Sequence, residues 1–409
     1  MALSPQGFSF AFALPELRHA IGFAESLVAK VSQTLPILKC VILESIPDTG
    51  EVLIKASTMD DSFSCRIKAQ SPPKGSAALP AAKLRSILAS LPDGRDVVIE
   101  SDATTPANAK IVSGRSRFKL LGMPAEDMPS QAPLGNRVLG FTLPGNQLDD
   151  WLSDVLYARP ASDHRRVLLG VNLDTGLGDG RRVMLTATDG KRLARSYRQK
   201  DQLNVPADVH RKATLPPAFS DNVAKIARMA NTENVTLELY ERRAVISYGA
   251  WSLTGSLLEG KYPDCDQVIP REFSASITFD AGGLESVVKQ AVTLANDTNQ
   301  SVIMNFEPGA TAVSITSMSA DVGAFEGSCD FQSNDPVEAL EVAMNVKFLL
   351  ESLRRVRANG SEALTMRIQS NTSPILLVES DERVERIIMP IKLAEAKGAA
   401  DVSSGEEAA

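Results

Sequence analysis

The sequence is poor in the residue types that carry most metal and nucleophilic chemistry. It has three histidines, His19, His164 and His210, and none has the spacing of a metal ligand. Its four cysteines are far apart and form no Cys-x-x-Cys pair, so we expect reduced, buried thiols rather than disulfides or a zinc ribbon. Three scattered histidines also argue against a Ser-His or Cys-His nucleophile. We therefore expect no cofactor and no bound metal.

Long apolar runs and a targeting leader are missing as well. No stretch of about 18 apolar residues occurs, so no membrane-spanning helix is predicted. The apolar start lacks a basic region and is interrupted by Pro15, Glu16 and Arg18, which is not typical of a signal peptide. Aromatic residues make up only 5%, so the cores must consist mainly of Leu, Val, Ile and Ala. We expect a soluble, cytoplasmic protein with no membrane partner.

The size and charge of the chain limit its organisation and its partners. A length of 409 residues suggests two to three domains. The formal net charge is −7, which argues against a tight, passive nucleic-acid binder. Any interaction with nucleic acid would therefore need a local concentration of positive charge.

The most informative feature is a threefold internal repeat on the scale of a domain. Each repeat opens with a predicted strand and helix, and Leu17, Leu148 and Leu284 mark corresponding positions that are 131 and 136 residues apart. Two strands joined by a tight turn follow in each repeat. The opening segments are residues 8–30, 138–156 and 274–292.

A second helix and a further strand complete each repeat, so each domain uses a strand–helix–strands module twice. These segments are residues 79–100, 215–239 and 344–368. Hairpins dominate, which predicts an α+β protein with antiparallel sheets. We expect three domains at residues 1–132, 136–270 and 272–393, followed by a small, acidic, disordered tail at 394–409.

Two short motifs resemble catalytic signatures but fit structural turns better. Residues 48–50 and 174–176 are both Asp-Thr-Gly, as in paired aspartic-protease turns, yet both lie at the same predicted hairpin turn. Residues 255–261 match most of a P-loop, but Tyr262 and Pro263 follow where Ser or Thr and a helix are required. We expect no catalytic activity, and a hydrolase that uses Asp48 and Asp174 remains a rival hypothesis.

Basic residues recur on the predicted helices and would give the acidic chain a local positive surface. The alternative is an ordinary solvated face with i,i+4 pairs, such as Lys347, Glu351 and Arg355 on one helix. Recurrence on related helices favours a common surface that attracts phosphates without reading bases. The candidate residues are Arg18, Lys83, Arg165, Arg166, Lys225, Arg228, Arg354 and Arg355.

Five short motif groups, in this order and combined with the threefold repeat, resemble the bacterial DNA polymerase III beta sliding clamp family. The resemblance covers residues 8–393. The motifs are Thr-Leu-Pro-Ile-Leu at 34–38, Ser-Gly-Arg-Ser-Arg-Phe at 113–118 with Met-Pro-Ala-Glu-Asp-Met-Pro at 123–129, Ala-Thr-Asp-Gly-Lys-Arg-Leu at 187–193, Tyr-Pro-Asp at 262–264 with Val-Ile-Pro at 268–270, and Ile-Met-Pro-Ile-Lys-Leu at 388–393.

This resemblance implies three tandem clamp domains, with antiparallel sheets outside and helices lining a ring. It implies a head-to-tail homodimer that encircles double-stranded DNA without sequence specificity. Such a clamp is non-catalytic and confers processivity on the replicative polymerase. The implied partners are the polymerase alpha subunit, the clamp loader, repair polymerases and mismatch-repair or ligase-type proteins, which would dock through linear motifs.

The resemblance also implies two kinds of protein contact. Near the dimer contact lie Phe118 and Leu120, with Leu294 on the third domain, although all three fit an ordinary core equally well. A peptide pocket between the second and third domains would suit motifs with acidic or glutamine anchors. Its wall would consist of Leu168, Thr188, Gly190, Lys191, Arg192, Leu193, Pro263, Val268, Ile387, Met389, Pro390 and Ile391.

Some positions depart from the family pattern. Gln267 stands where an arginine is common, and Arg166 with Val167 replaces aromatic residues. Family members usually end near residue 393, so we expect the acidic tail at 394–409 to lie over Lys191 and Arg192. The rival to a clamp is a clamp-like scaffold that binds peptides but does not encircle DNA.

Overall fold

A computed structural model of the chain describes residues 7–28, 35–176, 180–294, 300–319, 323–334 and 336–392. The acidic tail at 394–409, with its expected place over Lys191 and Arg192, lies outside the described residues. The chain divides into two compact units, and each is described by itself. The first comprises Met1–Gly145 and Asp221–Leu257, and the second comprises Asn146–Ser220 and Leu258–Ala409.

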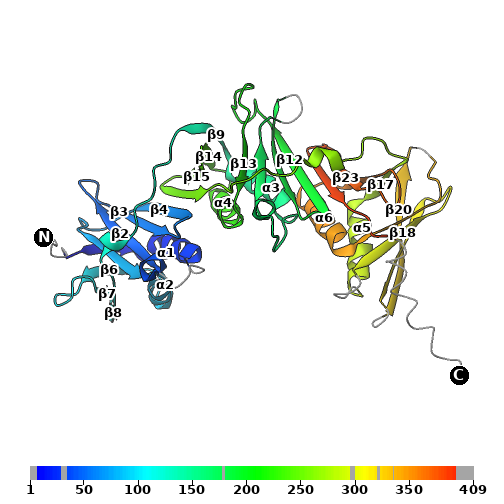
Figure 1. Ribbon diagram of the computed structural model, residues 1–409. Coiled ribbons are helices and arrows are strands. Elements are labelled where there is room, and N and C mark those ends of the chain that lie inside the picture. Colours follow the sequence, from blue (N-terminus) through cyan, green and yellow to red (C-terminus); the bar gives the residue numbers. More distant parts are fainter. Residues whose placement is uncertain are drawn as a thin grey trace. The chain divides into compact units, whose positions relative to one another are not determined.

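The first unit contains two antiparallel sheets (Figure 1). In the described residues, a four-stranded sheet has the order β1 (Ser9–Ala13), β6 (Asp96–Ser101), β7 (Ala109–Ser113), β8 (Ser116–Leu120). An eight-stranded sheet has the order β5 (Ser76–Pro80), β2 (Cys40–Ile46), β3 (Glu51–Ser57), β4 (Asp61–Lys68), β16 (Trp251–Ser256), β15 (Arg243–Tyr248), β14 (Asn234–Tyr240), β9 (Arg137–Pro144). Helix α1 (Leu14–Val28) packs against helix α2 (Ala81–Ser90) and against β3 and β4.

The second unit is built on one long antiparallel sheet. Its described strands have the order β13 (Lys212–Leu215), β10 (Val171–Asp174), β11 (Arg182–Thr188), β12 (Arg192–Gln199), β24 (Val384–Ile388), β23 (Ile375–Glu379), β22 (Ala363–Ile368), β17 (Ala275–Asp280), β20 (Gly323–Ser333), β19 (Ala312–Ser319), β18 (Ser301–Phe306), β21 (Leu340–Asn345). Helices α5 (Ala281–Val292) and α6 (Val346–Ala358) pack together. Helix α3 (Gly145–Leu156) belongs to this unit from Asn146 onward, and α4 (Pro217–Ala230) belongs to the first unit from Asp221 onward.

Local sequence explains where the helices form. Helix α6 begins after Asn345, whose Oδ1 accepts hydrogen bonds from the Lys347 and Phe348 amides at 2.9 and 3.2 Å. Such an N-cap satisfies amides that the first helical turn leaves unpaired. Leu349 and Leu353 lie on its buried stripe, and the basic side chains of its last turn suit the negative end of the helix dipole.

The threefold repeat predicted from the sequence is confirmed. The predicted strand–helix openings are β1–α1, β9–α3 and β17–α5, and the second helices are α2, α4 and α6. The predicted hairpins are β2–β3, β10–β11 and β18–β19, and every strand pair in the described residues is antiparallel. Each hairpin also has a third strand, β4, β12 or β20, which the sequence analysis did not identify.

A buried ionic cluster connects segments of the second and third repeats within the second unit. The Asp154 carboxylate, on α3, is 2% exposed and lies 3.3 Å from the Arg355 guanidinium on α6 and 3.6 Å from that of Arg386 on β24. Arg386, fully buried, also pairs with the buried carboxylate of Glu379. Buried charges of opposite sign offset the desolvation cost of one another. Removing one member would therefore leave its partner as an unpaired charge in an apolar environment.

Neutral donors complete this cluster. Asn359, just after α6, donates to Asp154 Oδ1 at 2.9 Å and to Glu379 Oε1 at 3.1 Å. Ser196 on β12 donates to Asp154 Oδ2 at 2.9 Å, and Ser361 donates to Glu379 Oε2 at 2.8 Å. The cluster thus holds α3 and β12 against α6, β23 and β24.

We expect Asp154→Ala to destabilise the folded chain by about 3–5 kcal/mol, because Arg355 and Arg386 would lose a buried counter-charge. Chemical denaturation monitored by circular dichroism measures this loss. The matched control is Glu382→Ala, whose carboxylate pairs with Arg367 at 2.9 Å on the surface and should cost less than about 1 kcal/mol. Equal losses for both variants would contradict a structural role of the cluster.

Candidate functional site

The structure brings the predicted peptide-pocket residues together where β12 pairs with β24 in the second unit. Leu193 is opposite Ile387 in this antiparallel register, and Arg192 is opposite Ile388. Just beyond the paired strands, the Met389 amide donates to the Lys191 carbonyl at 2.9 Å. The end of the chain's last described strand is therefore fixed beside the turn that precedes β12.

That turn presents its side chains in a defined way. Thr188 Oγ1 donates to the Arg192 carbonyl at 2.6 Å and accepts from the Gly190 amide at 3.0 Å. Asp189 Oδ1 accepts from the Lys191 and Arg192 amides, both at 2.9 Å. Gly190 has a φ of +82°, a conformation that glycine adopts without strain. The turn leaves Lys191 exposed at the rim.

The linker that follows residue 261 covers one face of this strand junction. It contains the 3-10 helix η4 (Cys265–Val268), and Cys265, Ile269 and Phe273 pack on a buried cluster. The buried members of that cluster are Leu193, Leu376, Val378 and Ile387. Val268 and Met389 are not absorbed into it and are 45% and 38% exposed. Exposed large apolar side chains at the edge of a packed core are typical of a docking surface.

The remaining predicted pocket residues lie on other segments of the second unit or just after β24. Leu168 is buried in the 3-10 helix η3 (Arg166–Leu169), which leads into β10, and β10 pairs with β11 up to Thr186. Pro263 is exposed at the start of the linker, and Pro390 is half-buried. Ile391 donates its amide to the Ala343 carbonyl at 2.8 Å. We name these twelve predicted residues, from Leu168 to Ile391, the docking surface.

Arg192 has partners that the sequence analysis did not connect with the site. Its guanidinium pairs with the Glu351 carboxylate on α6 and with Asp189 at 3.1 Å. It also lies over the Phe348 ring at 4.3 Å from the centroid and near the Tyr157 ring at 5.4 Å, which places it in cation–π range of both. The spacing of Glu351 allowed i,i+4 pairs along α6 as one alternative; the structure pairs it with Arg192, which is 159 residues distant.

Arg18, Arg165 and Arg355, which are predicted to face DNA, bind groups within their own unit. Arg18 donates to the Leu88 carbonyl at 3.1 Å and the Leu91 carbonyl at 2.9 Å, which satisfies the end of α2. Arg165 pairs with Asp163, and Arg355 belongs to the buried ionic cluster.

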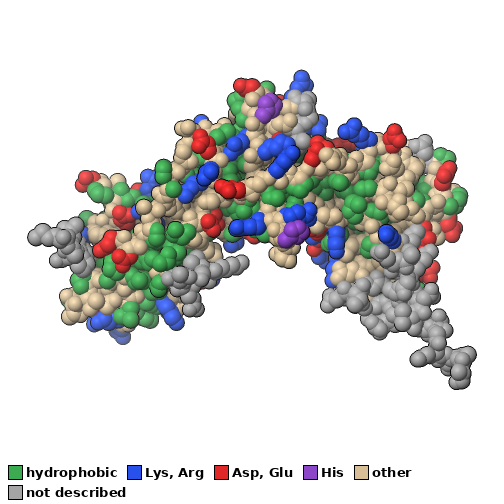
Figure 2. All heavy atoms as spheres, in the orientation of Figure 1, with side chains coloured by type: hydrophobic (Ala, Val, Ile, Leu, Met, Phe, Trp, Pro, Cys, Tyr) green, Lys and Arg blue, Asp and Glu red, His purple; other side chains and the backbone are tan. Residues whose placement is uncertain are grey.

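The other predicted DNA-facing residues are exposed, namely Lys83, Arg166, Lys225, Arg228 and Arg354. Lys225 lies within 3.0 Å of the Asn222 side-chain oxygen on its own helix. Figure 2 shows acidic and basic side chains intermingled over the visible face, without one large field of a single sign. Contact of these residues with DNA stays a prediction.

The predicted dimer residues lie at two places. Phe118 is half-buried on β8, the outermost strand of its sheet in the described residues, and Leu120 is 9% exposed at its end. The next residue, Leu121, is 69% exposed. Leu294 is half-buried just after α5, and its amide donates to the Ala291 carbonyl at 3.3 Å. Their role in dimerisation stays a prediction.

The rival hydrolase hypothesis has little support in the geometry. Asp174 is 2% exposed, accepts a hydrogen bond from the Gly176 amide at 2.8 Å and pairs with Lys212 at 2.9 Å. Asp48 has a φ of +59° and belongs to the tight turn between β2 and β3. Both residues therefore have structural roles in turns, as expected for Asp.

The described part of the chain has free cysteines and no candidate metal cluster. No group of three His, Cys, Asp or Glu side chains there is arranged to hold a metal ion. The four cysteines are free; three are buried, and burial raises the pKa of the half-buried Cys265 to about 11. No helix within the described ranges is both long and apolar enough to cross a bilayer.

The repeated architecture and its matches define the class of protein. The structure matches a DNA polymerase sliding clamp from Pseudomonas aeruginosa with a TM-score of 0.84 and 22% identity, covering 94% of this chain and 100% of that one. A Caulobacter crescentus beta sliding clamp matches with a TM-score of 0.85 and 23% identity over 95% and 100% of the two chains. The fold is that of a sliding clamp, with three clamp domains.

Family models and curated relatives give the particular family. The models for the N-terminal, central and C-terminal domains of the DNA polymerase III beta subunit match residues 16–132, 142–264 and 266–392. A Chlamydia muridarum "Beta sliding clamp" is 29% identical over 94% of this chain and 99% of its own length. One from Caulobacter vibrioides is 27% identical over 92% and 98%. The chain belongs to the DNA polymerase III beta subunit family.

The Arg192–Glu351 pair leads to a prediction about the docking surface. Glu351 already supplies the carboxylate that an acidic docking peptide would offer to Arg192. We therefore expect Glu351→Gln to raise the affinity for a labelled peptide with Asp between two leucines by about two- to fivefold. This change corresponds to the free energy of one partly exposed ion pair. Fluorescence polarisation measures the affinity.

Two controls define the result. The same peptide with Asn in place of Asp should gain little from Glu351→Gln, and Glu382→Gln should change neither affinity. A loss of affinity in Glu351→Gln would show that Glu351 supports Arg192 rather than competing for it.

Proposed function

We propose that the chain is a non-catalytic sliding clamp, which closes with a second copy into a ring around duplex DNA and tethers the replicative polymerase. The observation that carries the proposal is a rule of strand pairing between repeats. Where two repeats meet, the third strand of one hairpin pairs antiparallel with the last strand of the following repeat. These pairs are β4–β16 in the first unit and β12–β24 in the second.

By the same rule, β8 as a last strand and β20 as the third strand of a hairpin stand at the two ends of the series of repeats. Strand β8, the last of the first repeat, pairs in the described residues only with β7. In the described part of the chain, strand β20, the third strand of the last hairpin, pairs with β19 at residues 323–330 and with β17 at residues 331–333. Exposed strand edges favour pairing with another chain. A second copy would supply the missing partner for each, β8 of one chain with β20 of the other.

This pairing is head-to-tail and closes with two copies, as a cyclic dimer requires. Phe118 at the centre of β8 and Leu121 just after it would provide apolar contacts beside the new strand pair. Leu294 would lie on the facing surface of the second copy. Under this proposal the domain boundaries are those expected from the sequence, residues 1–132, 136–270 and 272–393. The protein would work in the cytoplasm, where the chromosome is.

The docking surface supports a role in tethering. Its exposed Val268 and Met389 offer adaptable apolar contacts, and Lys191 and Arg192 offer positive charge to acidic motifs. We propose that the polymerase alpha subunit, the clamp loader, repair polymerases and mismatch-repair or ligase-type proteins dock there in turn. A solved Pseudomonas aeruginosa sliding clamp is bound to griselimycin, so a related clamp accepts a ligand.

We expect Phe118→Arg to prevent ring closure, because an interface core rarely tolerates an unpaired charge. The free energy of dimer association should become less favourable by about 2 kcal/mol or more. Light scattering should give the mass of one 43.9 kDa chain for the variant and of two for the unaltered protein. After treatment with a clamp loader, only the unaltered protein should be retained on nicked circular plasmid and lost on linearisation.

The control is Val138→Arg, which alters an exposed apolar residue on another outermost strand, β9. It should remain dimeric. An unaltered protein that is monomeric, and that still binds motif peptides, would support the rival scaffold instead of the clamp.

The exposed basic residues lead to a separate prediction. Reversing the charge at Lys225, Arg228 and Arg354 should reduce loading onto DNA and lower the slope of log affinity against log salt by about 2–3, since three phosphate contacts would be lost. Arg355 must be left intact, because its loss would break the buried cluster. Retention on nicked plasmid at several salt concentrations measures the effect.

A second triple variant with the same net charge separates position from total charge. It reverses Arg66, Lys68 and Lys110, which are exposed on β4 and β7. Equal loss of loading in both variants would contradict a specific DNA-facing surface.

A further inference from the structure

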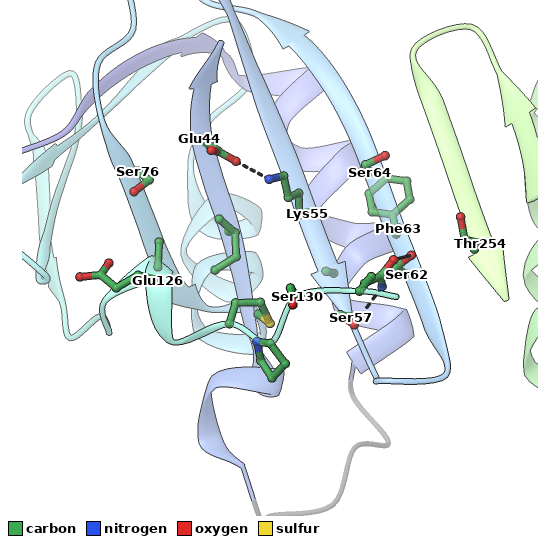
Figure 3. Close-up of a pocket in the computed structure, with 16 residues that line it drawn as sticks. Glu44, Lys55, Ser57, Ser62, Phe63, Ser64, Ser76, Glu126, Ser130 and Thr254 are labelled. Carbon is green, nitrogen blue, oxygen red and sulfur yellow. Dashed lines mark hydrogen bonds and ion pairs between the residues drawn. The ribbon is translucent and has the colours of Figure 1, made fainter. Parts of the chain in front are cut away.

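The first unit contains a cavity that lies outside the docking surface. It has a volume of about 580 Å³, within the range of small-ligand and peptide sites. Figure 3 shows it between strands β2, β3 and β4 and the linker that follows β8. The linker contains the 3-10 helix η2 (Ala125–Asp127). Apolar contacts come from Ile42 and Met128.

This cavity occupies the place in the first repeat that the docking surface occupies in the second. Ser57 pairs with Ser62, and Ser62 pairs across the repeat junction with Thr254. In the second unit, Thr188 pairs with Leu193, and Leu193 pairs across its junction with Ile387. The two rows of three residues are therefore in equivalent register.

The neighbouring segments correspond as well. The turn before β4 has a positive φ at Met59, +81°, as the turn before β12 has at Gly190, +82°. Each linker has a proline, Pro124 or Pro263, shortly before its 3-10 helix. The two sites thus correspond in strand register and in the turn that precedes the third strand, and their side chains differ.

Those side chains change the chemistry of the first site. Where the second unit has Leu193 and Ile387 in a buried apolar cluster, the first has the hydroxyls of Ser62 and Thr254. Small polar residues fill less space than leucine and isoleucine, which leaves the cavity open. Further hydroxyls on its wall are those of Ser57, Ser64, Ser76 and Ser130.

The chain itself shows which group this wall accepts. The carboxamide of Gln131, on the linker, lies between the wall hydroxyls of Ser57 and Ser62, which Figure 3 labels. Its Oε1 accepts from Ser62 Oγ at 2.5 Å, and its Nε2 donates to Ser57 Oγ at 3.2 Å. Gln131 is otherwise exposed, so another carboxamide could replace it at the cost of these two hydrogen bonds.

We propose that this cavity is a second docking site, which binds an extended segment of a partner protein through a glutamine or asparagine side chain that displaces Gln131. The wall is suited to a neutral group, because the Glu44 and Lys55 side chains pair with each other. The analogy with the docking surface rests on the proposed function, whereas the cavity, its hydroxyls and the bound carboxamide do not.

The experiment uses the full-length protein with ¹³C-labelled methionine methyls and three blocked tripeptides, acetyl-Ala-Gln-Ala-amide and its Glu and Lys counterparts. Met128 on the cavity wall reports binding there, and Met389 reports binding at the docking surface. The Gln probe should shift Met128, and it should bind Gln131→Ala about threefold or more tighter than the unaltered protein, because the internal carboxamide is gone. Adding Ser62→Ala should abolish this gain.

The half-buried Met229 on α4, which lies in the same unit as the cavity, reports whether each variant is folded. Ser86→Ala, on the exposed face of α2, is the matched control and should leave binding unchanged. A Met128 signal unmoved by the Gln probe in Gln131→Ala would overturn the proposal. Movement of Met389 alone would also overturn it, while leaving the proposed docking surface intact. Equal binding of the Glu or Lys probe would refute the assigned ligand class.

Discussion

Pairing of strand edges is the constraint on which this architecture depends. A strand edge exposes amides and carbonyls that need partners, and an unpaired edge promotes association. The chain meets this need by joining repeats edge to edge, so that β4–β16 and β12–β24 make continuous sheets from separate repeats. The linkers then need only to span the junction. Because three repeats have two internal junctions, one edge of each kind is left over, which is why a second copy is the natural way to complete the structure.

The two junctions show how one backbone arrangement can serve different purposes. At β12–β24, the apolar pair Leu193 and Ile387 belongs to the buried cluster on which the linker packs, while Val268 and Met389 at its edge stay exposed. At β4–β16, Ser62 and Thr254 give the linker no apolar cluster of this kind, and a cavity remains. Burial of apolar area holds both linkers, because Met123, Ala125 and Met128 of the first linker pack on the buried cluster of Ile37, Leu38, Cys40, Ile42 and Ala78. Within the cavity, by contrast, the Gln131 carboxamide is held by two hydrogen bonds of small net free energy, so this side chain can be displaced without moving the linker.

Periodicity and repetition predicted much of the fold but little of the side-chain pairing. The three repeats, their helices and the hairpins follow from local patterns, which the sequence displays directly. The third strands β4, β12 and β20 were missed, although each forms a hairpin with the strand directly before it. Their pairing across a repeat junction, as in β4–β16 and β12–β24, joins segments far apart in the sequence and could not be predicted from local patterns. The docking-surface residues came from family motifs. The partners of Arg192 could not be predicted, since Glu351 is 159 residues distant and no local spacing connects the two.

Several arginines bind carbonyls or carboxylates of the fold itself, which reduces the positive charge that can attract phosphates. Among the arginines, Arg18 satisfies the end of α2, Arg192 is held by Glu351, and Arg355 and Arg386 neutralise buried carboxylates. These charges are committed to the fold and contribute little to attraction of phosphates at a distance. Fewer free cations remain than the sequence suggests, on a chain whose net charge is −7. We therefore expect the electrostatic attraction of this protein to DNA to be weak. A protein with weak electrostatic attraction can still be held on DNA if it encloses it, since topology restricts escape without slowing movement along the duplex.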